Sequence, residues 1–319
     1  MIKKIAIFTS GGDAPGMNAA VRVCIRSGLY YGKEMYVIYD GYKGLIEGDI
    51  HQVNKEFTAD IITRGGTILR SSRLPEFCEN EVQLKAIEKL RDYDIDAVIG
   101  IGGDGTFRGL QALSNHGFPV IGIPATIDND VGSTDYTIGF MTALNTICDC
   151  IDKIKDTSSS HQRCSVIEVM GRLCGDLAVY SSIAEAAELT LSYGHKSTEE
   201  SVIKRLKKLK AQKKSHAIVV VSENLLDVHA LAKRIEEQTG FETRAEVLGR
   251  LQRGGSPCAF DRILASQLGL AAIECLINNE HGKIMNWVNG KVEASNIDEA
   301  LKEVKDSQEI LGRMIDILQ

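Results

Sequence analysis

Proline and long apolar runs are scarce in this sequence of 319 residues, which holds only 5 prolines. Together with 44% apolar and 25% charged residues, this composition excludes a largely disordered chain. The apolar part of the opening segment "MIKKIAIFTSGGD" ends at glycines after a few residues, so we expect neither a signal peptide nor a membrane anchor. We therefore expect a cytoplasmic protein with no membrane partner.

Three further absences exclude particular kinds of binding site. The Lys and Arg residues form no single basic block and the net charge is −6, so we expect no nucleic-acid partner. The sequence contains neither GKS nor GKT, which excludes a Walker-type phosphate loop. No cysteine pair has CxxC or zinc-site spacing, and we interpret the cysteines as reduced core residues. They are Cys24, Cys78, Cys148, Cys150, Cys164, Cys174, Cys258 and Cys275.

Short β-branched runs alternate with amphipathic stretches, which is typical of βαβ units and a mostly parallel sheet. The predicted strands are residues 4–9, 35–39, 97–101, 120–123, 165–170, 217–222 and 245–248. The predicted helices are residues 16–31, 81–92, 140–156, 201–210, 228–239, 259–278 and 296–318. Two runs of these units predict two similar α/β lobes with a boundary near Gly139.

The loops that follow the predicted strands are rich in glycine and polar residues. In parallel sheets the ligand lies beyond the carboxyl ends of the strands. After the first strand, "TSGGDAPGMN" runs directly into a helix, and Gly11, Gly12 and Gly16 could let backbone N–H groups surround a phosphate. A plain tight turn is the alternative for this loop taken alone.

A second glycine-rich loop, "IGIGGDGTFRG", matches GxGxxG at Gly100, Gly102 and Gly105. Alone, this pattern is a weak sign of a dinucleotide site. Asp104 would repel a bare pyrophosphate, whereas a magnesium ion between the carboxylate and the phosphates reverses the sign of the interaction. The loop therefore favours a metal–nucleotide complex over a nicotinamide dinucleotide.

The next strand leads into "PATIDND", which carries Asp128 and Asp130. In a stretch of extended character, carboxylates two residues apart point the same way, so one could accept a proton while the other adjusts its pKa. A turn rich in Asp and Asn is the alternative. A set of arginines, several of which follow predicted strands, adds the forks that an anionic substrate requires, although any one of them alone could be a plain surface residue. These are Arg73, Arg163, Arg172, Arg244, Arg250 and Arg253.

The motifs "TSGGDAPGMNAA", "RGGT", "IGGDGT", "TIDND", "TIGF", "DTSSSHQR", "EVMGR" and "QRGGSP" occur in an order and at spacings that resemble the bacterial-type ATP-dependent 6-phosphofructokinases, from residue 1 to about 275. The resemblance implies two Rossmann-like lobes, each a mostly parallel sheet flanked by helices. Residues 1–138 with roughly 252–305 would bind ATP, and 139–251 with roughly 306–319 would bind the sugar phosphate. It also implies Mg²⁺-dependent transfer of the ATP γ-phosphoryl group to the 1-hydroxyl of fructose 6-phosphate, releasing ADP, in an allosterically regulated homotetramer.

The resemblance also implies roles for individual residues. Those for ATP are Gly12, Arg73, Leu74, Gly103, Asp104, Gly105 and Thr106, with Asp104 serving the metal. Those for catalysis are Gly12, Thr126, Asp128, Asp130 and Arg172, with Asp128 as the base. Those for the sugar phosphate are Thr126, Ile127, Asp128, Arg163, Met170, Gly171, Arg172, Glu223, Arg244, Arg250 and Arg253, with Arg163 and Arg244 supplied by a neighbouring subunit. Those for a nucleoside-diphosphate effector are Arg22, Arg26, Lys55, Lys155, Glu188 and Lys214.

The sequence also departs from the family pattern. Pyrophosphate-dependent relatives carry a second Asp at the position of Gly105 and a Lys at that of Ala125, so ATP is the expected donor. Ala125 itself stands where a glycine is usual, and Arg250 replaces a histidine, which bears on sugar selectivity. In the effector set, Lys55 replaces an arginine and Ala186 a glycine, which predicts weaker or altered regulation.

Two other classes of function stay open on sequence alone. A Rossmann dehydrogenase would need an acidic ribose-binding residue after the strand that follows its glycine loop, and "VIGIPAT" offers none. A non-catalytic relative would bind sugar phosphate or nucleotide without turnover, and Ala125 with Arg250 motivates that alternative.

Overall fold

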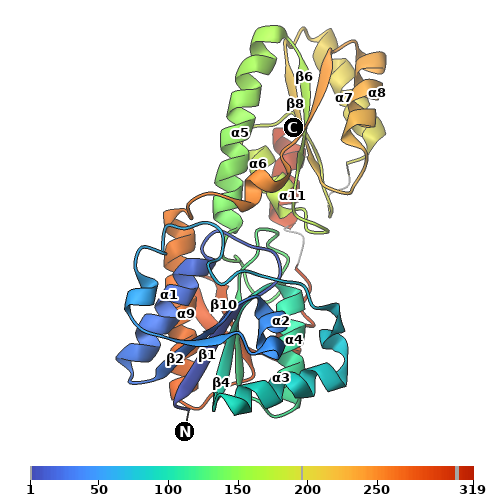
Figure 1. The fold of residues 1–319 in the computed structure, drawn as a ribbon. Coiled ribbons are helices and arrows are strands. Elements are labelled where there is room, and N and C mark those ends of the chain that lie inside the picture. Colours follow the sequence, from blue (N-terminus) through green and yellow to red (C-terminus); the bar gives the residue numbers. More distant parts are fainter. Residues whose placement is uncertain (1, 195–196, 306–308) are drawn as a thin grey trace. The chain divides into compact units, whose positions relative to one another are not determined.

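The computed structural model describes residues 2–194, 197–305 and 309–319, and the chain divides into two compact units (Figure 1). The first unit contains Met1–Thr142 and Arg253–Lys305, and the second contains Ala143–Gln252 and Asp306–Gln319. Each unit consists of one sheet with helices on both faces, so each has its own hydrophobic core.

The first unit is built on a seven-stranded sheet with the order β11-β10-β5-β4-β1-β2-β3. The central strands β1, β2, β4, β5 and β10 run parallel, while β3 and β11 are antiparallel at the two edges. The strands are β1 (Lys4–Thr9), β2 (Glu34–Ile38), β3 (Ile50–Val53), β4 (Ala97–Gly102), β5 (Val120–Pro124), β10 (Lys283–Val288) and β11 (Lys291–Asn296).

Helices cover both faces of this sheet (Figure 1). On one face α1 (Met17–Tyr30) packs against α9 (Ala259–Ile277). On the other lie α2 (Gly41–Glu47), α3 (Asn80–Asp92) and α4 (Asp104–Asn115), which enclose a core containing Phe8 and Phe107. Short elements complete the unit: η1 (Glu56–Thr58), η2 (Pro75–Cys78) and α10 (Ile297–Ala300).

The second unit has a four-stranded, wholly parallel sheet with the order β7-β8-β6-β9. Its strands are β6 (Cys164–Val169), β7 (Leu189–Leu191), β8 (Ala217–Ser222) and β9 (Thr243–Val247). Helices α7 (Glu199–Ala211) and α8 (Val228–Thr239) cover one face, and α6 (Asp176–Ala184) packs with α11 (Glu309–Leu318) on the other (Figure 1). Helix α5 (Phe140–His161) leads into the unit, and η3 (Gly249–Arg253) leads out of it.

The prediction of parallel sheets flanked by helices is confirmed, and three elements match residue for residue: 4–9, 217–222 and 228–239. The prediction of one helix over 296–318 is wrong, because α10 ends at Ala300 and α11 begins at Glu309. Between them Lys305 Nζ donates to the carbonyls of Thr134 (2.6 Å) and Asp135 (2.8 Å). Those tertiary contacts hold residues 301–305 outside helical structure, which local amphipathicity does not reveal.

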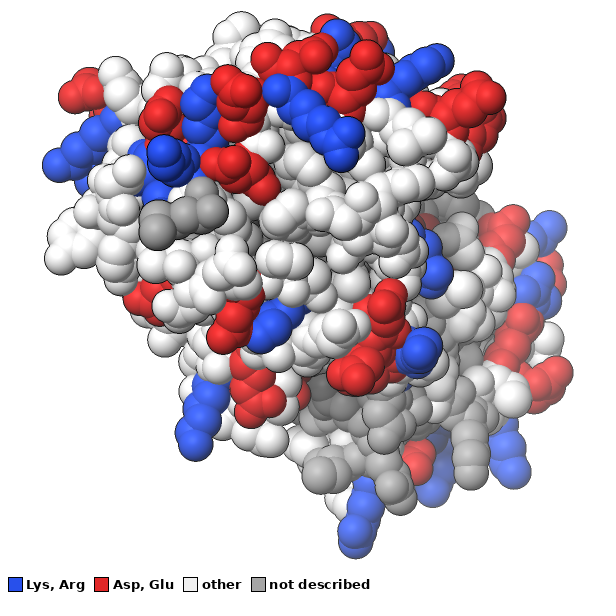
Figure 2. All heavy atoms as spheres, turned by 90° about the horizontal axis from the view of Figure 1, so that it is seen from below, with Lys and Arg blue, Asp and Glu red and all other residues white. Residues whose placement is uncertain are grey.

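All eight cysteines are free, as expected. Burial raises the pKa of Cys24 and of Cys164 to about 12, so both thiols stay protonated at neutral pH. The prediction of a core position holds for these two, whereas Cys78 is exposed at the end of η2 and the other five cysteines are only partly buried. Over the described ranges, every helix is too short or too polar to cross a bilayer. On the face drawn in Figure 2, basic and acidic side chains are interspersed.

Candidate active site

Three polar loops of the first unit leave neighbouring strands. Residues 9–16 begin at the last residue of β1, residues 102–106 run from the last residue of β4 into the first turn of α4, and residues 125–130 follow β5. Strands β5, β4 and β1 are adjacent and parallel, so the three loops emerge at the same edge of the sheet. The sheet topology therefore gathers the phosphate-loop glycines, Asp104 and the two predicted catalytic carboxylates in one region.

The loops after β1 and β4 lie so close together that only glycine fits between them. A Cβ atom on Gly102 would lie 2.5 Å from Ser10 O and 2.2 Å from Thr106 Oγ1. The Ser10 N–H donates to Ile101 O at 3.0 Å. A Cβ on Gly103 would lie 3.7 Å from Thr126 Cβ, which brings the third loop into van der Waals range. The backbone of these loops is therefore fixed by packing.

Asp104 is the first residue of α4 and has a cationic neighbour in the structure. Its carboxylate accepts a hydrogen bond from Arg108 Nε at 2.8 Å, and the two side chains are 44% and 63% exposed. Sequence reasoning missed Arg108, although the i,i+4 spacing on a helix is the signal that could have found it. A pair this exposed contributes little to stability, so the carboxylate can exchange its partner.

The loop after β5 buries Asp128, which is only 2% exposed. The prediction of extended backbone here is wrong: Ile127 and Asp128 lie in a turn, and Asn129 has a left-handed conformation with φ of 53°. Asn129 is fully buried and accepts a hydrogen bond from the Thr137 N–H at 3.0 Å. The Thr137 hydroxyl donates to Thr126 O at 2.6 Å. Asn129, which sequence reasoning passed over, therefore fixes the loop that carries the carboxylates.

Arg253 lies beside the phosphate loop of the first unit. A Cβ on Gly12 would lie 3.2 Å from one terminal nitrogen of its guanidinium group, and its ion pair with the Asp13 carboxylate is long, at 3.7 Å. Arg73 is exposed, and its segment is tied to the same loop because the Ser71 hydroxyl donates to Gly11 O at 2.6 Å. Arg253 therefore lies against the loop of residues 9–16, and the segment that carries Arg73 is anchored to the same loop two residues earlier, at Ser71.

In the second unit, the "MGR" segment follows β6 and is held by two side chains. Glu223 Oε1 accepts hydrogen bonds from the Arg172 N–H (2.9 Å) and the Gly171 N–H (3.3 Å). Gln252, fully buried and missed by sequence reasoning, accepts from the Met170 N–H at 3.0 Å. Arg172 itself has a positive φ of 51°. The structure thus brings four predicted sugar-binding residues together.

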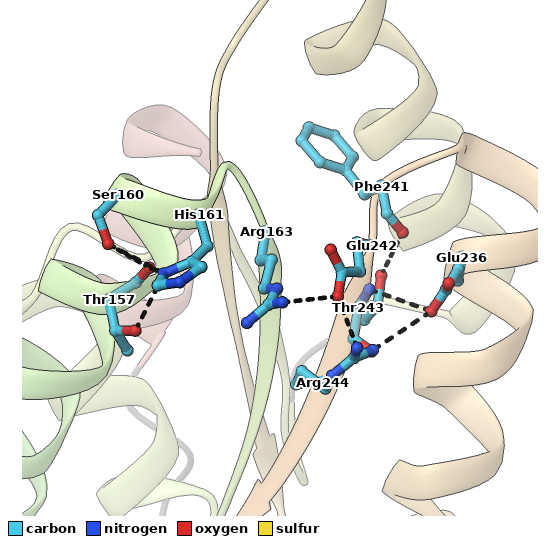
Figure 3. Close-up of polar contacts among 9 residues, drawn as sticks. All are labelled: Thr157, Ser160, His161, Arg163, Glu236, Phe241, Glu242, Thr243 and Arg244. Atoms are coloured by element: carbon cyan, nitrogen blue, oxygen red, sulfur yellow. Dashed lines mark hydrogen bonds and ion pairs between the residues drawn. The ribbon is translucent and has the colours of Figure 1, made fainter.

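Arg163 and Arg244 meet at one carboxylate (Figure 3). Glu242 Oε1 lies 2.8 Å from a terminal nitrogen of Arg163 and 2.5 Å from one of Arg244. The Arg163 guanidinium holds the pKa of Glu242 below its usual value. Glu242 directly precedes the edge strand β9, so the two arginines lie at the side of the sheet with the Glu242 carboxylate between them.

The remaining predicted residues are Arg250 and the expected effector set. Arg250 is exposed in η3. In the first unit, Arg26 Nε donates to Thr58 Oγ1 at 2.8 Å, and Thr58 donates to Lys55 O at 2.7 Å. Arg22 lies one turn before Arg26 on α1, and burial, followed by the charge of Arg26, lowers its pKa. Three predicted effector residues therefore lie together.

The other predicted effector residues, in the second unit, are paired with carboxylates. Lys155 Nζ donates to Glu185 O (2.6 Å) and to its carboxylate (3.2 Å), and Lys214 pairs with Glu188. The nearby Ala186 has φ of 49°, a conformation in which glycine is unstrained. These lysines would have to leave carboxylates before they could bind a phosphate.

Comparison with known proteins gives concordant matches. A family model described as phosphofructokinase matches residues 4–276. The ATP-dependent 6-phosphofructokinase of Photobacterium profundum is 51% identical over 305 residues, covering 96% of this chain and 95% of that protein. The one from Haemophilus influenzae is 49% identical over 306 residues, again covering 96% and 95%. A structure of phosphofructokinase from Saccharomyces cerevisiae superimposes with a TM-score of 0.86 at 30% identity, covering 94% of this chain and 45% of that longer chain.

Proposed function

The chain belongs to the phosphofructokinase family, and we propose that it transfers the γ-phosphoryl group of ATP to the 1-hydroxyl of fructose 6-phosphate, yielding fructose 1,6-bisphosphate and ADP in glycolysis. The observation that carries the proposal is the buried carboxylate of Asp128 on a loop that emerges beside two glycine-rich phosphate loops. A relative named as an ATP-dependent 6-phosphofructokinase, 51% identical over nearly the whole chain, supports the choice of donor and acceptor.

In this proposal Asp128 accepts the proton of the attacking sugar hydroxyl. Its burial keeps water from the carboxylate, and Asn129 holds the loop so that Asp128 keeps one position. Thr126 and Asp130 position the base, while the Gly12 N–H contacts the transferring phosphoryl group. Arg172 stabilises the charge that builds up on that group during transfer. Correct placement and electrostatic stabilisation supply most of the rate enhancement in phosphoryl transfer.

The donor set at Asp104 fits a magnesium ion bound together with a nucleotide. Mg²⁺ usually takes one or two protein carboxylates, and the substrate phosphates and water supply its other ligands. Among the residues that the structure describes, no group of three His, Cys, Asp or Glu side chains could hold a metal, whereas Asp104 offers one accessible carboxylate at a helix N-terminus. When bound there, Mg²⁺ would neutralise charge on the phosphates. Asp104 would exchange Arg108 for the metal.

The structure also bears on the choice between ATP and pyrophosphate. A Cβ on Gly105 would meet no atom within 4 Å, so space remains beside the α4 N-terminus for the part of a nucleotide that pyrophosphate lacks. Ala125 is fully buried and, unlike the lysine of the pyrophosphate-dependent relatives, brings no positive charge to the donor site. Both features favour ATP.

We further propose a homotetramer in which Arg163 and Arg244 serve the sugar-phosphate site of a neighbouring subunit. Strand β9 is an edge strand whose residues Arg244, Glu246 and Val247 are largely exposed, and an uncovered edge is suited to contact with a second chain. The paired state of Lys155 and Lys214 supports a weakened nucleoside-diphosphate effector site. A cytoplasmic enzyme is part of the same proposal.

A coupled assay with ATP and fructose 6-phosphate, run in parallel with pyrophosphate as donor, tests the reaction. We expect Mg²⁺-dependent formation of ADP and fructose 1,6-bisphosphate with ATP and none with pyrophosphate. Binding of both substrates without turnover would instead identify a non-catalytic relative. Sedimentation of the purified protein tests the tetramer.

A further inference from the structure

The "RGGT" motif of residues 64–67, here called the RGGT loop, has no part in the chemistry proposed above. Its first glycine, Gly65, packs against the backbone of Gly255. A Cβ on Gly65 would lie 2.2 Å from Gly255 O and 3.0 Å from the carbonyl carbon of the same residue. Since Cβ atoms do not approach backbone atoms this closely, only glycine permits the contact. Gly255 belongs to residues 253–256, here called the RGGS loop.

The RGGT loop is itself rigidly held by Asn18, a fully buried residue in the first turn of α1. Asn18 Nδ2 donates to Arg64 O (2.9 Å) and Gly66 O (2.8 Å), and its Oδ1 accepts from the Ile68 N–H (2.8 Å). Both amide hydrogens of Asn18 are therefore used on one short segment. The RGGT loop is thereby fixed to the helix that directly follows the phosphate loop of residues 9–16.

The RGGS loop begins with Arg253, whose guanidinium group lies beside Gly12. The side chain is 29% exposed, its only ion pair among the described residues is the 3.7 Å contact with Asp13, and its Nε is buried with no hydrogen-bond partner among them. A guanidinium group that is partly exposed and has only one long ion pair is available to an anionic ligand. Its position depends on how closely the RGGS loop approaches the rest of the unit.

We propose that the RGGT loop is a positioning element for Arg253. Gly65 sets the closest approach of the RGGS loop, and that distance places the Arg253 guanidinium beside the phosphate loop. The inference rests on the proposed function, because Arg253 is taken there as an anion-binding residue of the active site. Gly65 touches neither substrate, so its effect must pass through Arg253.

Gly65→Ala tests the proposal, and Gly66→Ala is the matched control. The new methyl group on residue 65 must push the RGGS loop away by about 1 Å, and a displacement of that size can lower a rate by ~10²-fold. We expect kcat/KM for fructose 6-phosphate to fall by that order. A Cβ on Gly66 meets no atom within 4 Å and its φ lies outside the left-handed region, so Gly66→Ala should retain wild-type kinetics.

A double-mutant cycle separates positioning from general damage. If Gly65 acts through Arg253, then Gly65→Ala should cause no further loss in an Arg253→Ala background. Losses that multiply, or a Gly65→Ala variant as active as Gly66→Ala, would overturn the proposal. Should Gly65→Ala fail to fold, Asn18→Asp removes two hydrogen bonds to the RGGT loop without adding a heavy atom and should lower the same ratio.

The proposed function can fail separately. A wild-type protein that transfers no phosphoryl group from ATP to fructose 6-phosphate would overturn the reaction but not the positioning. Calorimetric titration of fructose 6-phosphate into wild type, Gly65→Ala, Gly66→Ala, Arg253→Ala and the double variant then gives the second readout. We expect the affinity of Gly65→Ala to fall toward that of Arg253→Ala; equal affinities for Gly65→Ala and Gly66→Ala would overturn the positioning role.

Discussion

The two units fix their functional groups by different means. In the first, loops lie backbone against backbone, as at Gly102, where an added Cβ would lie 2.5 Å from Ser10 O. In the second, charged side chains hold each other, as at Glu242, whose carboxylate lies between Arg163 and Arg244. The packed backbone at Gly102 allows only one position of the two loops. The charged side chains around Glu242 can instead leave each other and pair with another charged group.

This difference predicts how each unit responds to change. A substitution at a packed loop glycine of the first unit, such as Gly102, acts through distance and should be insensitive to salt. In the second unit the three charged side chains are between 32% and 52% exposed, so a substitution acts through a charge balance that salt screens. The experiments below test that contrast, beginning with the largest expected effect.

Asp104→Ala should abolish Mg²⁺-dependent turnover and leave the melting temperature unchanged. The exposed carboxylate is proposed to compensate phosphate charge through the metal, and its pair with Arg108 adds little stability. Arg108→Gln, which removes the same ion pair but keeps the carboxylate, is the control and should retain turnover. Wild-type activity of Asp104→Ala at ordinary magnesium concentrations would disprove the metal assignment.

Asp128→Asn should lower kcat by ~10²- to 10⁴-fold, the usual contribution of a positioned general base, with modest change in either KM. The side chains are nearly isosteric, so the buried loop keeps its shape. Steady-state kinetics at saturating ATP and fructose 6-phosphate measure the effect. Near-normal turnover would remove Asp128 from the role of base.

The sequence predicts the local features of both units well. Short β-branched apolar runs locate β1 and β8, and glycine-rich loops after strands indicate where a phosphate would lie. Glu242 could also have been found, because it precedes Arg244 by two residues, and such spacing on a strand places side chains on the same face. These features depend on neighbours in sequence.

Contacts between distant segments could not be predicted. Asn18 holds residues about 50 positions away, and Gly65 touches Gly255 across most of the chain. The left-handed turn at Asn129 depends on a hydrogen bond from Thr137, so the local pattern alone suggested extended backbone. The conformations of these residues are determined by packing against distant parts of the folded unit, so the sequence of the local segment alone does not predict them.

Glu242→Gln should lower the KM for fructose 6-phosphate by about 2- to 5-fold, the range that the usual energy of an exposed ion pair allows. Removing the carboxylate charge frees Arg163 and Arg244 for the substrate phosphate. The gain should shrink as salt is raised. Glu236→Gln weakens a 3.7 Å contact with Arg244 and keeps an amide oxygen that can accept from the Thr243 N–H, so it should change KM less. A rise in KM would show that Glu242 positions the arginines rather than competing with the phosphate.

The smallest effect concerns the pH dependence of stability, where the two units should differ in sign. Asp261 in the first turn of α9 is fully buried and accepts hydrogen bonds from the Thr142 N–H (2.8 Å) and hydroxyl (2.5 Å). Burial raises its pKa above the unfolded value of 3.8. A raised pKa contributes stability below pH 3.8 that is lost as the pH rises through the folded pKa. Glu242, with a lowered pKa, contributes stability above pH 4.5 that is lost as the pH falls.

Melting temperatures of wild type, Asp261→Asn and Glu242→Gln, measured in steps from about pH 3.5 to 7, show in which direction each carboxyl group changes stability with pH. The melting temperatures of wild type and Asp261→Asn are compared over the whole pH range. At any single pH the difference also contains a constant contribution from the changed hydrogen bonds to Thr142. Relative to Asp261→Asn, wild type should lose stability as the pH rises above 3.8, by a few degrees at most, since 1 kcal/mol shifts a domain of this size by about 2–4 °C. Relative to Glu242→Gln, wild type should instead gain stability as the pH rises. Parallel curves for wild type and Asp261→Asn would show that the buried carboxyl keeps one protonation state throughout this range, and the contrast between the units would then rest on geometry alone.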